Sequence, residues 1–173
     1  MKESITIIDQ QNLFNIHFDD IKKYHGLTNI AGAAIGFKAM QAVATELSID
    51  GALPRKNLHV ETGHPGSGVR DAIEFITRCI TDKNYVVNRN LPEARWNPYG
   101  DLSFSFYVSL NKEKVEVLLK PKQLPPLFFD LMKQVAEHNL PEDHQALAAL
   151  KIGLASQLVK KDCRSLFDIK SFP

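Results

Sequence analysis

Alternating hydrophobic and polar residues predict a pair of strands in the middle of the chain. Over residues 102–110, leucine, phenylalanine and valine at every second position alternate with serine and tyrosine. This is the spacing of a strand with one buried face. Polar residues 111–113 allow a turn into a second strand over residues 114–120, so the two segments form a predicted hairpin.

Two shorter strands are predicted before this hairpin. Residues 55–62 alternate, which places their hydrophobic side chains on one face and the polar His59 and Glu61 on the other. Residues 85–88 suit a short strand, and residues 91–98, with two prolines, suit an irregular connection.

Helical spacing dominates the first part of the chain. Residues 13–24 are predicted to form a short amphipathic helix that stops at Gly26. Residues 30–49 are rich in alanine and glycine, and Gly32 and Gly36 lower helix propensity. We therefore expect these glycines to mark close contact with a neighbour, and the segment to be a buried central helix.

A glycine-rich turn and further helices complete the pattern. After the turn at residues 63–68, hydrophobic residues follow helical spacing over residues 69–80. The remainder, residues 124–173, is predicted to be helical, with Pro141 placed as a first-turn proline.

Length and composition agree with one α+β domain. The chain has 173 residues, of which 44% are hydrophobic and 24% charged, and this is ordinary for a domain with one buried core. We predict a single domain over residues 1–173. It contains a central, mostly antiparallel sheet, a buried Ala/Gly-rich helix and additional C-terminal helices.

Charge and cysteine usage exclude several classes of protein. The chain has 21 basic and 20 acidic residues and a formal net charge of +1. A nucleic-acid binder needs a concentrated basic face, which this near-balance does not supply. No apolar run approaches the roughly 20 residues of a membrane span, and the N-terminus lacks the apolar segment of a signal peptide. Two cysteines without a C-x-x-C pair predict a cytoplasmic protein with reduced thiols.

Several residues between positions 25 and 79 are of the types that bind a divalent metal ion. His25, His59, His64 and Cys79 offer the nitrogen and thiolate ligands that zinc prefers. Three such ligands with an open position suit a catalytic site, and four suit a structural site. Their spacing matches no zinc signature such as H-E-x-x-H, so the residue types alone do not specify a site.

Each of these residues also has a structural interpretation. His25 can cap the end of its helix, and His59 can form a solvated or paired face with its neighbour Glu61. His64 lies in a turn, where exposure is usual. Cys79 falls on the apolar face of its predicted helix, which favours a small buried hydrophobe. Asp71 can stabilise the start of the same helix through its dipole.

Two ordered blocks of residues resemble the FmdE family of formylmethanofuran dehydrogenase and its stand-alone relatives. That family opens with Phe-His-Gly-His and a helix of the type G-L-A-x-G-Y-R-A. Its second block runs V-E-x-G, then P-x-S-C-x-x-D-[AG]-I-Q-x-x-T-G-C-T, then G-K-x-N. The matching segments here are Tyr24-His25-Gly26, Gly32 to Ala39, Val60 to Gly63, Pro65 to Glu74, Thr77 to Ile80, Asp82 to Asn84, Pro92 to Arg95 and Gly100 to Tyr107.

The resemblance covers about residues 21–120, inside a family-like core of about 13–120 that precedes a helical extension of about 124–173. It implies an α+β fold, frequent dimerisation and a His/Cys cluster that binds a metal, commonly zinc. The chain departs from that cluster, because Leu27 stands in place of the second histidine and Gly68 in place of a cysteine.

The residues and the resemblance together support three hypotheses. The first is a metal-binding relative whose site lies between the His25 loop and the strand–loop–helix unit of residues 59–79. Its ion is divalent: zinc, nickel, copper or iron. Its expected ligands are His25, His59 and His64, its alternative or nearby ligands are Cys79 and Asp71, and its pocket residues are Tyr24, Thr28 and Asn29.

The second hypothesis is a metal-free binding or assembly module, homodimeric, that takes an unidentified small molecule or protein partner. The third is a thiol-dependent enzyme that uses Cys79, which the predicted apolar position disfavours. Cys163 follows two lysines, which can lower a thiol pKa, but its position in the tail makes it a poor catalytic candidate.

Overall fold

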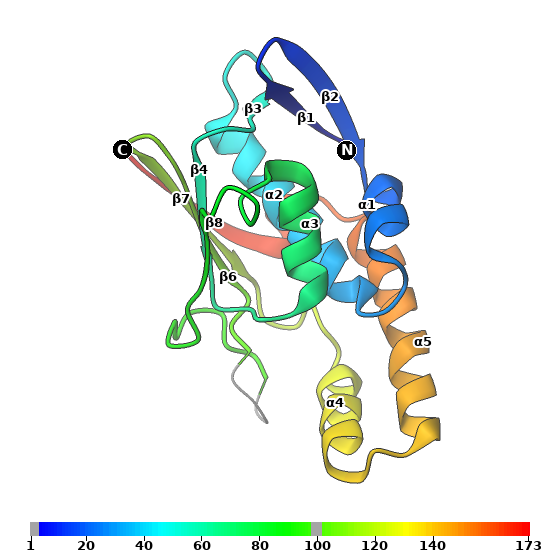
Figure 1. Ribbon diagram of the computed structural model, residues 1–173. Coiled ribbons are helices and arrows are strands. Elements are labelled where there is room, and N and C mark those ends of the chain that lie inside the picture. Colours follow the sequence, from blue (N-terminus) through cyan, green and yellow to red (C-terminus); the bar gives the residue numbers. More distant parts are fainter. Residues whose placement is uncertain (1–3, 98–101) are drawn as a thin grey trace.

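A five-stranded sheet lies at the centre of the computed structural model, which describes residues 4–97 and 102–173 (Figure 1). In spatial order its strands are β5 (Tyr85–Val87), β4 (Leu58–Thr62), β6 (Ser105–Leu110), β7 (Glu113–Leu119) and β8 (Phe167–Phe172). The pair β4–β5 is parallel and the other neighbours are antiparallel. The predicted fold class, α+β with a mostly antiparallel sheet, is confirmed.

Helices α2 (Ile30–Leu47) and α3 (Ser67–Thr77) lie on one face of this sheet (Figure 1). Val60 and Val108 on the sheet are buried on that side. Fourteen of the 18 residues of α2 are buried, so the prediction of a buried Ala/Gly-rich helix is confirmed. Because α2 is enclosed by other elements, its position determines where the elements around it can lie.

A second, small sheet replaces part of a predicted helix. Its strands are β1 (Ser4–Asp9), β2 (Asn12–His17) and the two-residue β3 (Leu53–Pro54), in the order β2-β1-β3. The prediction of a helix over residues 13–24 is therefore wrong in its first half. β2 forms an antiparallel hairpin with the neighbouring β1, whose Ile5 and Ile7 are buried, and this pairing overrides the helical pattern.

The second half of that predicted helix is correct. Helix α1 (Phe18–His25) ends at Gly26, where φ is 84°. A positive φ costs a residue with a side chain conformational energy that glycine avoids, so the helix stops where the sequence indicates.

The C-terminal part holds α4 (Pro126–His138), α5 (Pro141–Leu158), the short α6 (Cys163–Leu166) and then β8. Both long helices start at proline, as predicted, but the prediction that residues 124–173 are helical throughout is wrong for β8. That strand pairs with β7, whose backbone hydrogen-bonding groups would otherwise form an open edge. No helix in the described part of the chain is long and apolar enough to cross a membrane.

Two predicted strands begin later than expected. Strand β4 starts at Leu58, not at residue 55, and β6 starts at Ser105, not at residue 102. Residue 98 of the predicted irregular connection and residues 100–101 of the family-like strand lie outside the described residues. The predicted faces of β4 are confirmed, since Leu58 and Val60 are buried and His59 is exposed.

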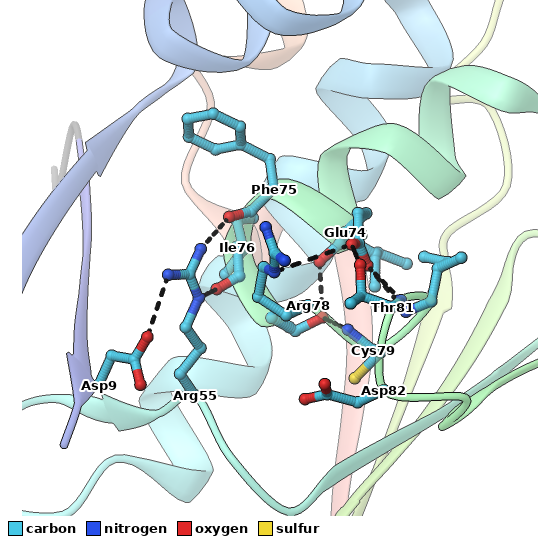
Figure 2. A network of polar contacts seen from close by, with 12 residues as sticks. Asp9, Arg55, Glu74, Phe75, Ile76, Arg78, Cys79, Thr81 and Asp82 are labelled. Carbon is cyan, nitrogen blue, oxygen red and sulfur yellow. Dashed lines mark hydrogen bonds and ion pairs between the residues drawn. The ribbon is translucent and has the colours of Figure 1, made fainter.

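Figure 2 shows how polar contacts fix the C-terminal end of α3. The Arg55 guanidinium donates hydrogen bonds to the carbonyl oxygens of Phe75 (2.8 Å) and Ile76 (3.2 Å), and it pairs with Asp9 of β1 at 3.4 Å. The Glu74 carboxylate accepts a hydrogen bond of 2.8 Å from the backbone of Ile80. Arg55 thus satisfies carbonyl groups that the helix end leaves free, and Glu74 binds the turn that follows the helix.

Helix α3 therefore ends at Thr77, before the predicted end at residue 80. Arg78 adopts a left-handed conformation with φ of 64°, and Cys79 lies beyond the helix in the following turn (Figure 2). The prediction that Cys79 sits on a helix face is wrong, but the prediction that it is a buried small residue is confirmed, because it is 1% exposed.

Helices α2 and α3 approach each other so closely that their contact requires glycine. A Cβ atom added at Gly68 would lie 2.4 Å from the Asn29 carbonyl oxygen and 2.6 Å from the Ala33 nitrogen. At Gly36 an added Cβ would lie 3.1 Å from Cβ of Ala72. The prediction that glycines in α2 mark tight contact is confirmed, and the tightest position is Gly68 on the partner helix.

We expect Gly68→Ala to lower the free energy of unfolding by about 1–3 kcal/mol, the usual cost of forcing extra atoms into a packed contact. Gly153→Ala is the matched control, because nothing lies within 4 Å of its added Cβ and the residue is inside helix α5. That change should stabilise the protein by up to about 1 kcal/mol through helix propensity. Urea unfolding measures both. Equal stability of the two variants would contradict the observed packing.

Candidate functional site

The three predicted histidine ligands lie in different surroundings. His59 is exposed on β4, on the face opposite to the buried Val60 and thus away from α2 and α3. His25 ends α1, and His64 lies in the loop between β4 and α3. Within residues 4–97 and 102–173, no three His, Cys, Asp or Glu side chains gather in a group that could hold a metal ion.

Both ring nitrogens of His25 are engaged by protein groups. Nε2 is 2.5 Å from the Thr28 carbonyl oxygen, and Nδ1 is 2.7 Å from Oδ2 of Asp71. A carbonyl oxygen only accepts a hydrogen bond, so Nε2 is the donor to Thr28, and Nδ1 faces the Asp71 carboxylate. In this arrangement His25 presents no free lone pair to a metal ion.

The His25–Asp71 contact joins the end of α1 to α3. Burial alone would raise the pKa of Asp71, but hydrogen bonds from His25 and Arg70 and the charges of those groups hold this pKa below its usual value. Arg70 donates to the second carboxylate oxygen at 2.9 Å and 3.0 Å. Asp71, predicted as a nearby or alternative ligand, thus holds the loop of residues 26–29 in place.

The predicted pocket residues Tyr24, Thr28 and Asn29 also lie in different surroundings. Tyr24 is 56% exposed and stacks against the Phe75 ring, with centroids 5.5 Å apart. Thr28 is exposed and supplies the carbonyl oxygen that His25 binds. Only Asn29 lines a cavity, together with His64.

Backbone atoms occupy the position where the resemblance places a cysteine. A side chain at residue 68 would collide with the first turn of α2. Leu27, at the position of the motif's second histidine, is 58% exposed. The two motif positions that this chain has changed therefore do not face a common centre with His25.

Cys79 does not have the surroundings of a reactive thiol. Its Sγ donates to the Leu58 carbonyl oxygen at 3.2 Å, and burial raises its pKa to about 11. A nucleophilic cysteine needs an accessible thiolate, which both properties oppose.

His64 is held in a fixed orientation next to a cavity. Its backbone N–H donates to Oγ1 of Thr62 at 3.1 Å, and its Nδ1 accepts from the backbone N–H of Gly66 at 3.0 Å. A Cβ at residue 66 would lie 2.5 Å from the ring atom Cε1, so glycine there lets the ring fold over the loop. Because Nδ1 accepts, the neutral ring carries its hydrogen on Nε2, and no described residue binds that atom.

The cavity has a volume of about 180 Å³ and lies where α2, the loop before α3, α4 and α5 meet. Its polar lining residues include His64, Asn29 and Lys151. Its hydrophobic lining residues include Ile35, Leu102, Phe104, Phe128 and Met132. The His64 and Phe104 rings are in contact, with centroids 5.0 Å apart.

Asn29 links Lys151 to the start of α2. The Lys151 ammonium donates to Oδ1 of Asn29 at 2.6 Å, and Asn29 Nδ2 donates to Oγ of Ser67 at 3.4 Å. Helix α2 has no side-chain cap and no acidic residue in its first turn. The positive end of its dipole therefore reaches the cavity without a compensating carboxylate from its own first turn.

Burial and charge keep His64 neutral. Burial lowers the pKa of His64 to about 4, and the nearby charge of Lys151 contributes to the same shift. Burial also lowers the pKa of Lys151. The site thus combines a neutral imidazole, which donates from Nε2, with an amine that the cavity shields from water.

Lys151 and the hydrophobic wall are functional candidates that the sequence pattern missed. Lys151 interrupts the apolar run ALAALKIGLASQL, and this is the one local signal that points to it. Phe128 and Met132 follow ordinary helical spacing and carry no such signal.

A comparison with protein families agrees with the resemblance. The family model described as "FmdE, Molybdenum formylmethanofuran dehydrogenase operon" matches residues 25–168. A search of the curated proteins found no match. One similar solved structure is a tungsten formylmethanofuran dehydrogenase FmdE-like protein from Syntrophus aciditrophicus. Its TM-score is 0.49 at 13% identity, and the alignment covers 91% of this chain and 72% of that chain.

The lowered pKa of His64 predicts a dependence of stability on pH. Between about pH 6.5 and pH 4 the unfolded chain binds a proton at His64 that the folded chain does not, so stability falls as pH falls through that window. From pH 7 to about pH 4.5, the wild-type protein should lose about 2 kcal/mol more than His64→Gln. Urea unfolding at the two pH values measures this difference. His59→Gln, at an exposed histidine, should behave as wild type, and equal pH dependence of all three proteins would refute the burial of a neutral His64.

Proposed function

Since the chain belongs to the FmdE family, we propose that it is a binding protein of that family whose ligand is a small organic carboxylate. The site is the cavity of His64 and Lys151. The observation that carries the proposal is the Nε2–H of a buried, neutral histidine, open to a cavity that also holds a lysine ammonium.

The polar side of the cavity favours a carboxylate. His64 Nε2–H and the Lys151 ammonium are both donors, and the N-terminal end of α2 adds a positive dipole. Hydrogen bonds that involve a charged partner are stronger than neutral ones, above all where water is excluded. Three features that attract negative charge therefore meet in one small space.

The hydrophobic lining residues of the cavity favour a ligand with a short hydrophobic tail. Phe104, Phe128 and Met132 contribute apolar surface whose burial against a ligand releases water. A cavity of about 180 Å³ has room for roughly six water molecules, and hence for a ligand of roughly six non-hydrogen atoms. Butyrate has that size, a carboxylate at one end and a propyl tail at the other.

Metal binding, the first hypothesis from the sequence, fits the described residues less well. His25 has no free ring nitrogen, His59 is on the outer face of β4, and Gly68 has no room for a side chain. Of the predicted ligands, His64 lines the cavity that also holds Lys151, while His59 lines a separate cavity on the outer face of the sheet. A metal site would need new positions for the others, so we derive no chemistry from a metal. Homodimerisation and a cytoplasmic location remain predictions.

The proposal predicts selective binding of butyrate. Isothermal titration calorimetry at pH 7 should show butyrate binding to the wild-type protein, and butyramide, of the same shape without the charge, should bind at least about tenfold more weakly. Lys151→Met should weaken butyrate binding by a similar factor. Lys160→Met, at an exposed lysine, is the matched control and should leave binding unchanged.

Binding results of two kinds would contradict the proposal: equal binding of butyrate and butyramide, or an equal loss of butyrate binding in both lysine variants. The proposal would also be contradicted if elemental mass spectrometry found a stoichiometric metal ion in the purified protein and His25→Ala and His64→Ala each removed that ion. The metal result would restore the metal-binding hypothesis.

A further inference from the structure

A second cavity, distinct from that of His64 and Lys151, surrounds a buried lysine. It has a volume of about 280 Å³ and lies between β1, α2 and the start of α6. Its walls include Ser4 of β1, Lys38 of α2, Ser48 directly after α2, and Asp162 and Cys163 at the start of α6. None of these residues belongs to the His64 cavity, so binding at this second cavity does not depend on the proposed function.

Lys38 is 1% exposed and forms one long hydrogen bond with a described residue. Its Nζ donates to the Val159 carbonyl oxygen beyond the end of α5 at 3.5 Å. This is longer than the roughly 2.7–3.2 Å of an ordinary N–H···O hydrogen bond. An ammonium has three donors, and among the described residues no other acceptor binds it. Leaving such donors unpaired in a buried place is costly.

Other polar residues in the walls of the cavity suit a small polar anion. Ser4 and Ser48 bring hydroxyl groups to the walls. Asp162 is exposed, and its Oδ1 accepts from the Arg164 backbone at 2.9 Å, so its carboxylate is engaged at the start of α6. The rim carboxylate of Asp162 repels further negative charge, so beside the Lys38 ammonium a singly charged anion is favoured over a doubly charged phosphate.

We propose that this cavity binds a small monocarboxylate through the Lys38 ammonium. The ligand's carboxylate accepts the hydrogen bonds that Lys38 otherwise lacks, and the hydroxyl groups of Ser4 and Ser48 bind its polar substituents. Burial lowers the pKa of Lys38, while the nearby Cys163 and Asp162 act in the opposite direction. An anion in the cavity adds to that opposing effect and keeps the ammonium charged.

The alkylation rate of the Cys163 thiol can be used to measure anion binding in this cavity. The sequence marks it as a poor catalytic residue, but the structure places its thiol in the wall of the Lys38 cavity at 8% exposure. A reagent reaches the sulfur by way of the cavity. Iodoacetate is itself a small monocarboxylate, and iodoacetamide is its neutral analogue. With either, the thiolate sulfur forms a bond to the methylene carbon and iodide leaves.

The ratio of the two alkylation rates at Cys163 tests the proposal. Burial raises the pKa of the Cys163 thiol, and the charge of Lys38 lowers it. A change in this pKa alters both alkylation rates by the same factor, so it cancels in their ratio. We expect Lys38→Met to lower the iodoacetate-to-iodoacetamide ratio by about tenfold, as for loss of a hydrogen bond to a charged group. Lys160→Met, at an exposed lysine three residues before Cys163, should leave the ratio unchanged. Peptide mass spectrometry separates Cys163 from Cys79.

A wild-type experiment covers the case in which Lys38→Met does not fold. Acetate should slow the alkylation of Cys163 by iodoacetamide, and acetamide at the same concentration should not. An unchanged ratio in folded Lys38→Met, an equal fall in Lys160→Met, or equal effects of acetate and acetamide would overturn the proposal.

Discussion

The contact between α2 and α3 at Gly68 determines how the rest of this structure is arranged. Backbone atoms of residues 29 and 33 occupy the space that any side chain at residue 68 would need, so the N-terminal ends of the two helices come together. Asn29 and His64 then lie at the same junction, and the cavity forms beside it. The His25–Asp71 contact holds the loop that leads into α2, and Arg55 holds the other end of α3 (Figure 2). Close packing of helices leaves little freedom at such a contact.

The same constraint separates this chain from the motif of its family. A site of two cysteines and two histidines needs side chains directed to one point, and its outer partners must hold them there. Here the motif histidine, His25, is bound to Asp71 and Thr28, and the position of a motif cysteine is filled by backbone. What the two motif blocks still do is bring α2 and α3 together. The open polar groups lie next to that contact, at His64 and Lys151.

The sequence predicted the local parts of the fold better than the non-local ones. The β6–β7 hairpin was evident because its alternation is long and its turn short, and the burial of α2 followed from its alanines and glycines. Strand β8 was missed because its partner, β7, is far away in the sequence. Strand β2 was missed because its neighbouring partner, β1, was not recognised as a strand. His64 was among the candidates, but its partner Lys151 lies in another helix, and only the folded chain brings them together. The grouping of His25, His59 and His64 around one ion remains a prediction, and in the structure strand alternation turns His59 outward.

We infer that protein groups, not a metal ion, hold the rings of His25 and His64 in their orientations. The ¹⁵N chemical shifts of the His25 and His64 rings at neutral pH, recorded with and without one equivalent of zinc, test this inference most directly. We expect a hydrogen on Nε2 of both rings, because Thr28 accepts from His25 and Gly66 donates to Nδ1 of His64. We also expect zinc to leave these signals in place. A shift of either ring to the values of a zinc-bound imidazole at equimolar zinc would contradict the inference.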